Sequence, residues 1–279
     1  MQHSIEQGLK KMMMSLISFS SYGKWNFESA YDTIYQAQHK SPRFREIVRS
    51  AFGDQYPEGL DNFSFVTRED LGLMAEVMSL GQGDRLADIA CGCGGPGMWL
   101  ARETGADLVG VDVSKQAVAN ASERIPEFGL TGRAAFSTGS FYHTGLETAS
   151  CDAAVSVDAL WVVPDRQRAL TEIRRILKPG ERFVFTTWDG NIPFMPDTHE
   201  ADLARAGFET RIYRETRGWK ERQLAVYEGV LNSRSTLIRE MGKKHARPII
   251  KEASATPAVL DRSRRIFAAA IKRSPGPDA

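Results

Sequence analysis

The sequence predicts an α/β protein built on a doubly wound, mostly parallel sheet of seven strands with helices on both faces. Three observations lead to this fold class. Apolar, strand-like runs alternate with helical segments from residue 85 onward. A glycine-rich turn at residues 92–97 follows the first run, and Asp112 ends the second. Alternation in units of this length is typical of parallel sheets that helices cover on both sides.

Apolar periodicity and helix-ending residues place the individual elements. Pro179-Gly180 indicates a tight turn between a helix and the strand that follows it. The last apolar run, Phe267–Ile271, fits either a helix or a strand. Strands are expected at about 85–90, 107–112, 133–138, 152–157, 181–188, 208–214 and, if the last run is a strand, 267–272. Helices are expected at about 96–104, 114–124, 166–177 and 198–206.

Helical segments flank this core on both sides. Residues 1–80 lack strand alternation, and Thr67 followed three residues later by Asp70 marks the start of their last helix. Apolar residues recur at helical spacing between Trp219 and Met241. We therefore expect an N-terminal helical cap at 1–80, a core at 81–216, a helical lid at 217–264, and the terminal strand of the core with a tail at 265–279.

Composition and charge argue against several classes of partner. Lys and Arg number 36 against 35 Asp and Glu, so no net field attracts nucleic acid or an anionic membrane. The basic cluster Arg262–Arg265 is interpreted as solvated surface. Cys91, Cys93 and Cys151 fit a reducing compartment, and their spacing does not indicate a metal site.

The N-terminal apolar run does not indicate a leader or an anchor. The run at 12–19 follows Lys10 and Lys11, but it is short and no clear small-residue cleavage site comes after it. We expect instead an N-terminal helix that lies over a pocket or against another subunit, which allows a homo-oligomer. No stretch reaches the length of a membrane span. The expected location is the cytoplasm.

The glycine-rich turn and Asp112 together predict a nucleoside site. Residues 86–97 read Leu-Ala-Asp-Ile-Ala-Cys-Gly-Cys-Gly-Gly-Pro-Gly, an apolar run that breaks into glycines. Glycines let the backbone turn sharply and approach a ligand. Asp112, at the end of the next strand, can accept both hydrogen bonds of a ribose diol. The spacing also satisfies the dinucleotide fingerprint. Asp88 argues against a dinucleotide, because a carboxylate favours a ligand with an ammonium group over a pyrophosphate.

The string Asp88-x-x-Cys-Gly-x-Gly-Gly-Pro-Gly97 resembles motif I of class I S-adenosylmethionine-dependent methyltransferases. Over roughly residues 60–190 the chain is similar to the small-molecule, methyltransferase domain 11-like members common in bacterial secondary metabolism. The resemblance implies a Rossmann-like core that ends in an antiparallel hairpin, which favours a strand at 267–272. It also implies S-adenosylmethionine as the cofactor.

The same resemblance implies which residues hold the cofactor. Asp88 orients the glycine loop, and Asp112 takes the ribose hydroxyls with Val113 beside the adenine. Ser140 stands where the family usually has an acid directed at the adenine amino group, although a helix-capping role is the alternative. The full expected set is Asp88, Ala90, Gly92, Gly94, Gly95, Asp112, Val113, Ser140, Phe141 and Asp158.

Three residues are candidates for catalysis. His143, just past Ser140, is the best-placed potential base, unless it is only a polar loop residue. Asp158 is either a proton or ammonium acceptor or a helix cap. Relatives that methylate hydroxyl groups often have His at the places of Trp161 and Val162, and this chain has none there. Tyr22 is the third candidate, through its aromatic face.

Aromatic residues are the candidates for the substrate pocket. Trp161 and Trp188 follow strand ends and are expected to line it, together with Tyr22 and Trp25 near the N-terminus. The N-terminal aromatics either pack a cap on the core or hold a cation against their faces. The missing His and the surplus of aromatic residues slightly favour methylation at carbon or nitrogen over oxygen, with a prenyl double bond as one such acceptor.

The expected function is methyl transfer from S-adenosylmethionine to a small, hydrophobic, natural-product-like acceptor, with no metal, nucleic acid or membrane partner. One alternative is a relative of the same fold that has lost methyl transfer and serves as a cyclase or binding scaffold. A second is an NAD(P)-dependent oxidoreductase. The oxidoreductase would need a second nucleotide-binding half and a Tyr-x-x-x-Lys pair, and neither is evident.

Overall fold

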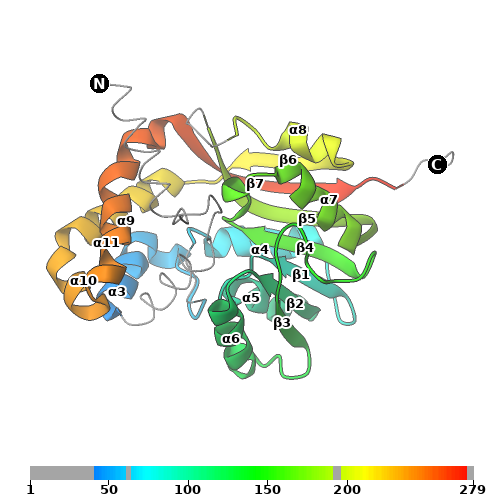
Figure 1. Ribbon diagram of the computed structural model, residues 1–279, viewed down its shortest axis with the longest axis horizontal. Helices are drawn as coiled ribbons and strands as arrows, with labels where there is room; N and C mark the ends of the chain where they lie inside the picture. Colours follow the sequence, from blue (N-terminus) through cyan, green and yellow to red (C-terminus); the bar gives the residue numbers. More distant parts are fainter. Residues whose placement is uncertain (1–40, 61–63, 191–195, 275–279) are drawn as a thin grey trace, which may run out of the picture.

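A central seven-stranded sheet organises the molecule, which we describe from a computed structural model (Figure 1). The structure describes residues 41–60, 64–190 and 196–274. The strand order is β3-β2-β1-β4-β5-β7-β6. The strands are β1 (Arg85–Ile89), β2 (Asp107–Asp112), β3 (Ala134–Thr138), β4 (Cys151–Val157), β5 (Leu177–Gly190), β6 (Phe208–Glu215) and β7 (Ser263–Lys272).

The direction of the strands decides where a ligand can lie. Strands β1 to β5 are parallel, whereas β7 runs antiparallel to both β5 and β6. The order reverses at β1, which pairs with β2 on one side and β4 on the other. The crevice beyond the carboxyl ends of these strands is the usual ligand site of an open α/β sheet. The mostly parallel, doubly wound fold class is confirmed, and the antiparallel β7 separates it from the all-parallel dinucleotide order.

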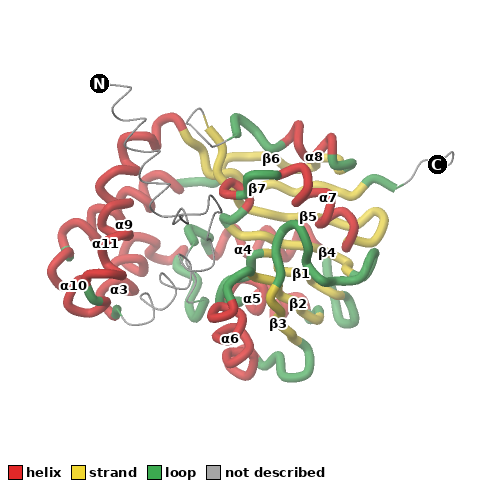
Figure 2. The backbone as a smooth tube through the Cα atoms, in the orientation of Figure 1, coloured by secondary structure: helices red, strands yellow, loops and turns green. Residues whose placement is uncertain are grey.

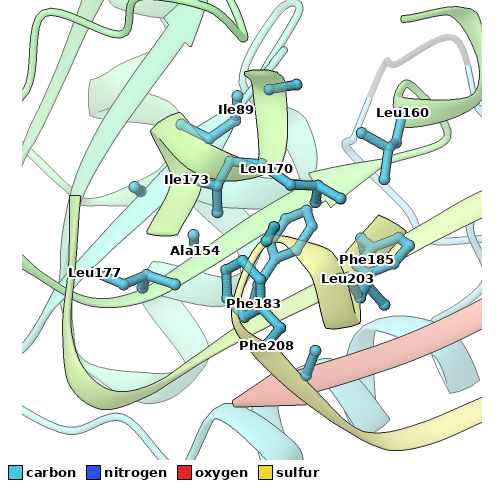
Figure 3. Close-up of a cluster of buried hydrophobic side chains, with 14 of the residues drawn as sticks. Ile89, Ala154, Leu160, Leu170, Ile173, Leu177, Phe183, Phe185, Leu203 and Phe208 are labelled. Atoms are coloured by element: carbon cyan, nitrogen blue, oxygen red, sulfur yellow. The ribbon is translucent and has the colours of Figure 1, made fainter. Parts of the chain in front are cut away.

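Helices cover both faces of the sheet. Helices α7 and α8 pack on one face, around Leu170, Ile173, Phe183 and Phe185 (Figure 3). Helices α4 and α5 pack on the other face. Successive strand residues alternate between the two cores, which explains the continuous apolar runs in the sequence. The helices of this part are α4 (Arg68–Met78), α5 (Gly95–Thr104), α6 (Lys115–Arg124), α7 (Arg166–Ile176) and α8 (Glu200–Arg205), with short 3-10 helices at Ile125–Phe128 and Leu160–Val162.

A separate group of helices lies beside the sheet and forms what we call the lid bundle: α3, α9, α10 and α11 (Figures 1 and 2). Phe44 and Ile47 of α3 share one buried cluster with Val226 and Val230 of α9. The Ser41 hydroxyl donates to Glu240 at 2.5 Å, which fixes the start of α3 against α10. The helices are α3 (Pro42–Phe52), α9 (Trp219–Asn232), α10 (Arg234–Met241) and α11 (Lys243–Ala255), with 3-10 helices at Gly53–Gln55 and Thr256–Arg262.

The segment predicted to form one N-terminal cap, residues 1–80, contributes one helix to the sheet core and another to the lid bundle. Helix α4 begins at the predicted Thr67–Asp70 capping box, and both hydrogen bonds of the box form. Its buried face packs on the sheet, whereas α3 packs in the lid bundle. The two helices have different partners because their apolar stripes face different cores, which no local pattern reveals. Residues 1–40 lie outside the described part.

Two predicted details differ from the structure. The turn expected at Pro179-Gly180 lies inside strand β5, which begins at Leu177 and pairs irregularly with β4 before Arg182. Strand β7 begins at Ser263, four residues earlier than expected, because its pairing with β5 extends to Gly190. Within the described residues, no helix is long and apolar enough to cross a membrane.

Candidate functional site

The loop between β1 and α5 has an unusual backbone. Ala90, Gly92 and Gly94 all have left-handed conformations, with φ of 59°, 52° and 75°. Such a φ costs an alanine about 1–2 kcal/mol, so the surroundings must hold it in place. Cys91 N–H donates to Val111 O at 3.1 Å, and Gly94 N–H donates to Cys91 O at 2.9 Å. The loop is therefore a fixed turn at the carboxyl end of β1.

Two later glycines allow close packing around this loop. A Cβ at Gly97 would lie 2.4 Å from Asp88 Oδ2, and a Cβ at Gly95 would lie 2.1 Å from the Leu60 carbonyl oxygen. Arg124 of α6 fixes that carbonyl, since its Nη1 donates both to Leu60 O at 3.0 Å and to Cys93 O at 2.9 Å. The chain before α4 is thus clamped onto the glycine loop. Sequence reasoning missed Leu60 and Arg124, because neither lies in a motif.

The carboxylate of Asp88 has a buried oxygen that indicates what kind of ligand the site can hold. The side chain is buried, and its Oδ2 has no hydrogen-bond partner in the described residues. Burial is the main cause that raises the pKa of Asp88 to about 7, the nearby Asp112 carboxylate raises it further, and the Gly97 backbone N–H opposes both. Buried polar atoms without a partner are rare in native proteins. A carboxylate oxygen in this state is suited to a cationic group that arrives with a ligand.

Asp112 links the ends of β1 and β2. Its Oδ2 accepts a hydrogen bond from Gly92 N–H at 2.8 Å, and its Oδ1 accepts one from Ser114 N–H at 2.9 Å. These bonds fix the carboxylate beside the glycine loop at the start of α6. Carboxylate oxygens can each accept more than one hydrogen bond, so an oriented Asp112 suits a diol.

The residues expected around an adenine lie at the neighbouring strand ends. Val113, after β2, is exposed. Ser140, after β3, accepts from Tyr142 N–H at 3.2 Å and shares two backbone hydrogen bonds with His143. Phe141 packs partly buried against the sheet core. The His143 side chain is exposed on this tight turn.

Asp158 is held by other residues. Its Oδ1 accepts from Arg265 Nε at 3.0 Å, and its Oδ2 accepts from Arg265 Nη2 at 3.2 Å and from Phe65 N–H at 2.9 Å. Arg265 is fully buried and also donates to Asp70 at 2.7 Å. The interpretation of the whole Arg262–Arg265 cluster as solvated surface is therefore wrong for Arg265. Its charge is buried because two carboxylates from distant segments meet it.

An aromatic cluster, formed by Phe65, Trp161, Trp188, Trp219 and Tyr227, lies between the strand ends and the lid bundle. The Trp188 ring contacts Trp219 at 5.1 Å and Phe65 at 6.1 Å, centroid to centroid. Trp161 Nε1 donates to Asp158 O at 3.0 Å. The structure thus brings the predicted Trp161 and Trp188 together. Sequence reasoning missed Phe65 and Tyr227. Tyr22 and Trp25 lie outside the described residues.

Comparisons with known proteins place a methyltransferase domain within the chain. Residues 87–185 match the family model described as "Methyltransferase domain". Methyltransferase GfsG of Streptomyces halstedii is 28% identical over 144 residues, which are 49% of this chain and 52% of that protein. The 24-methylenesterol C-methyltransferase 2 of Oryza sativa subsp. japonica is 31% identical over 136 residues, 49% of this chain and 38% of that protein. The chain therefore spans about half or less of these relatives' length.

Among solved structures, the [4+2]-cyclase SpnF superposes with a TM-score of 0.68 at 22% identity, covering 87% of this chain and 97% of that one. This likeness shows the fold. The family match shows that residues 87–185 are a methyltransferase domain of the class I S-adenosylmethionine-dependent type, and the strand order agrees with it.

Proposed function

We propose that this chain transfers a methyl group from S-adenosylmethionine to a small, largely apolar acceptor held between the sheet and the lid bundle. The observation that carries the proposal is the buried Asp88 oxygen that no described residue pairs with, which lies beside the fixed glycine loop. A nicotinamide dinucleotide would place a pyrophosphate at this loop, where a buried carboxylate is unfavourable.

The residues of the loop fit the proposed cofactor. Asp88 would compensate the charge of its ammonium group, and Asp112 would accept from its ribose hydroxyls. The expected remainder of the site is the backbone of Ala90, Gly92, Gly94 and Gly95, with Val113, Ser140 and Phe141 around the adenine. When bound, S-adenosylmethionine supplies an electrophilic methyl group on a sulfonium sulfur.

The protein's contribution to catalysis is positioning and exclusion of water. Of the candidate bases, His143 is exposed and Asp158 is bound to Arg265. A nucleophile that needs no prior deprotonation, such as an alkene carbon or a neutral amine, suits this arrangement. The aromatic cluster supports that choice, because aromatic faces stabilise a cation by about 0.5–2 kcal/mol. A relative named as a sterol C-methyltransferase also supports transfer to carbon.

The test is a methyl-transfer assay on the purified chain. Radiolabelled S-adenosylmethionine is incubated with matched acceptors: a prenyl alcohol, a sterol with a side-chain alkene, a tertiary amine and a phenol. We expect label in an alkene or amine product, and loss of label with Asp112→Ala. Asp107→Ala, an exposed acid at the start of β2, is the matched control. Tight binding of S-adenosylhomocysteine without methyl release on any acceptor would favour a cyclase or scaffold instead.

Two further expectations belong to this proposal. The lid bundle is expected to cover the acceptor, and the N-terminal segment is expected to contact either the pocket or a second copy of the chain. Light scattering on the full chain and on a chain that begins at residue 41 tests the second expectation. If both proteins form particles with the same number of chains, the N-terminal segment is not an oligomer contact.

A further inference from the structure

Helix α9 presents one polar residue within an aromatic face. Trp219, Gln223 and Tyr227 are spaced four residues apart, so they lie along one side of the helix. Trp219 contacts Trp188, and the Tyr227 ring lies 6.3 Å from that of Phe65. Phe65 and Trp188 contact each other. Gln223 therefore lies on α9 between two contacts with the aromatic cluster.

The orientation of the Gln223 amide is fixed by a chain of hydrogen bonds. Gln223 Nε2 donates to the Tyr227 hydroxyl at 2.6 Å, and that hydroxyl donates to Glu252 Oε1 at 2.9 Å. A tyrosine hydroxyl has one proton, so Tyr227 can only accept from Gln223 once it donates to Glu252. The nitrogen end of the amide thus faces Tyr227, and the oxygen end points away.

The oxygen end has no partner in the part of the chain that the structure describes. Gln223 is only 4% exposed, and its Oε1 is buried without a hydrogen bond from any described residue. Leaving a buried amide oxygen unpaired is destabilising. Its neighbours on α9 are Trp219 and Tyr227, whose rings belong to the aromatic cluster, and the Tyr227 hydroxyl already donates to Glu252. No described residue supplies a donor to this oxygen, which leaves it available to a donor on a bound ligand.

We propose that Gln223 is a specificity residue, whose Oε1 accepts a hydrogen bond from a hydroxyl or amine N–H on an otherwise apolar acceptor. This inference rests on the proposed function for the identity of its ligand as the methyl acceptor. The Tyr227 hydroxyl and Glu252 have a positioning role, because their hydrogen bonds hold the amide in the required orientation. The acceptor is thus a molecule with a large apolar body and one polar donor.

Binding of matched alcohols and ethers tests the proposal. The probes are farnesol against farnesyl methyl ether, and cholesterol against cholesteryl methyl ether. Binding is followed by quenching of tryptophan fluorescence in the presence of S-adenosylhomocysteine. We expect the wild-type chain to bind at least one alcohol about tenfold more tightly than its ether, because the ether lacks the donor.

Three variants assign that preference to the amide. Gln223→Met keeps the size of the side chain and removes the acceptor, so the preference should fall to about twofold or less while ether affinity stays unchanged. Tyr227→Phe frees the amide to rotate and should give an intermediate preference. The matched control, Gln116→Met, removes an exposed glutamine on α6 and should keep the wild-type preference. All three variants should bind S-adenosylhomocysteine with wild-type affinity, which would show that each of them is folded.

The outcomes separate this proposal from the proposed function. No preference for the alcohol in either pair, binding of neither member of either pair, or a preference that survives Gln223→Met overturns the role of Gln223. Methyl transfer observed alongside such a result leaves the proposed function intact. An alcohol preference that depends on Gln223, without methyl transfer to any acceptor, supports the binding role and contradicts the proposed function.

Discussion

Arg265 and Asp158 form a buried two-pronged ion pair, with Nε to Oδ1 at 3.0 Å and Nη2 to Oδ2 at 3.2 Å. The third nitrogen of the guanidinium donates to Asp70 at 2.7 Å. One side chain of β7 therefore connects the end of β4 to the start of α4. Since Asp158 also accepts from Phe65 N–H, the pair holds the backbone that places Phe65 in the aromatic cluster.

Removing this guanidinium should strongly destabilise the fold. In Arg265→Met, Asp158 and Asp70 would both be left buried without their cation, which typically costs about 3–5 kcal/mol. Urea unfolding measures the loss. Arg211→Met, which breaks an exposed pair with Glu209, is the control and should change the free energy of unfolding by less than about 1 kcal/mol. A loss of similar size in both variants would contradict the role given to Arg265.

Asp88→Asn should stabilise the ligand-free protein above neutral pH. The pKa of Asp88 is about 7 in the fold and close to 3.8 in the unfolded chain. Between these values the folded state keeps a proton that the unfolded state has lost, so wild-type stability falls as pH rises toward 7. The asparagine cannot ionise, and its advantage at pH 8 should be on the order of 4 kcal/mol. At pH 4 it should vanish. Thermal melting at both pH values checks this.

The same carboxylate should make cofactor affinity depend on pH. An ammonium ligand favours ionised Asp88, so below pH 7 binding must also remove a proton. As the pH is lowered below 7, wild-type affinity for S-adenosylhomocysteine should then fall by up to about tenfold per pH unit. Calorimetry between pH 5.5 and 8 measures it. Asp88→Asn should bind weakly with a flat profile, whereas Asp107→Asn should keep the wild-type slope. A flat wild-type profile would disprove an ammonium contact.

Gly95→Ala should disturb the contact between the glycine loop and the chain before α4. The new Cβ would meet the Leu60 carbonyl, which is backbone held by Arg124 and so has little room to move. We expect a loss of about 1–3 kcal/mol in unfolding free energy, with weaker binding of S-adenosylhomocysteine. Gly72→Ala, in open space on α4, should instead add up to about 1 kcal/mol. If both variants behave alike, the close approach is not a constraint.

Two alanine variants separate base catalysis from cation stabilisation. His143 is exposed, so His143→Ala should leave kcat/KM for the true acceptor within about threefold of wild type. Tyr22→Ala tests the prediction that an N-terminal aromatic face stabilises a cation, and should lower kcat about tenfold. Steady-state kinetics across pH 6–9 measures both. A large loss with His143→Ala, restored by raising the pH, would identify His143 as the base.

The elements that local patterns encode were predictable. The glycine loop, Asp88 and Asp112 lie within 25 residues of one another, and the Thr67–Asp70 capping box spans four. The apolar runs of β1 and β4 read clearly as strands, because both faces of a parallel strand are buried. The turn predicted at Pro179-Gly180 was wrong as a boundary between helix and strand. Gly180 has φ 83° but lies within β5, where pairing with β4 resumes at Arg182. The prediction that Arg265 is solvated was also wrong, because its carboxylate partners are 107 and 195 residues away in the sequence.

By itself the sequence determined the sheet class and the position of the glycine loop, because turns, strands and a capping box depend on residues that are neighbours in the chain. The tertiary structure alone decided which buried charges are compensated and which are not. It gave Arg265 two carboxylates, left one oxygen of Asp88 and one of Gln223 without a partner among the described residues, and joined α3 to α9–α11. Burial and ion pairing depend on contacts between distant segments, and the free energy of a buried polar atom depends on which partner the fold brings to it.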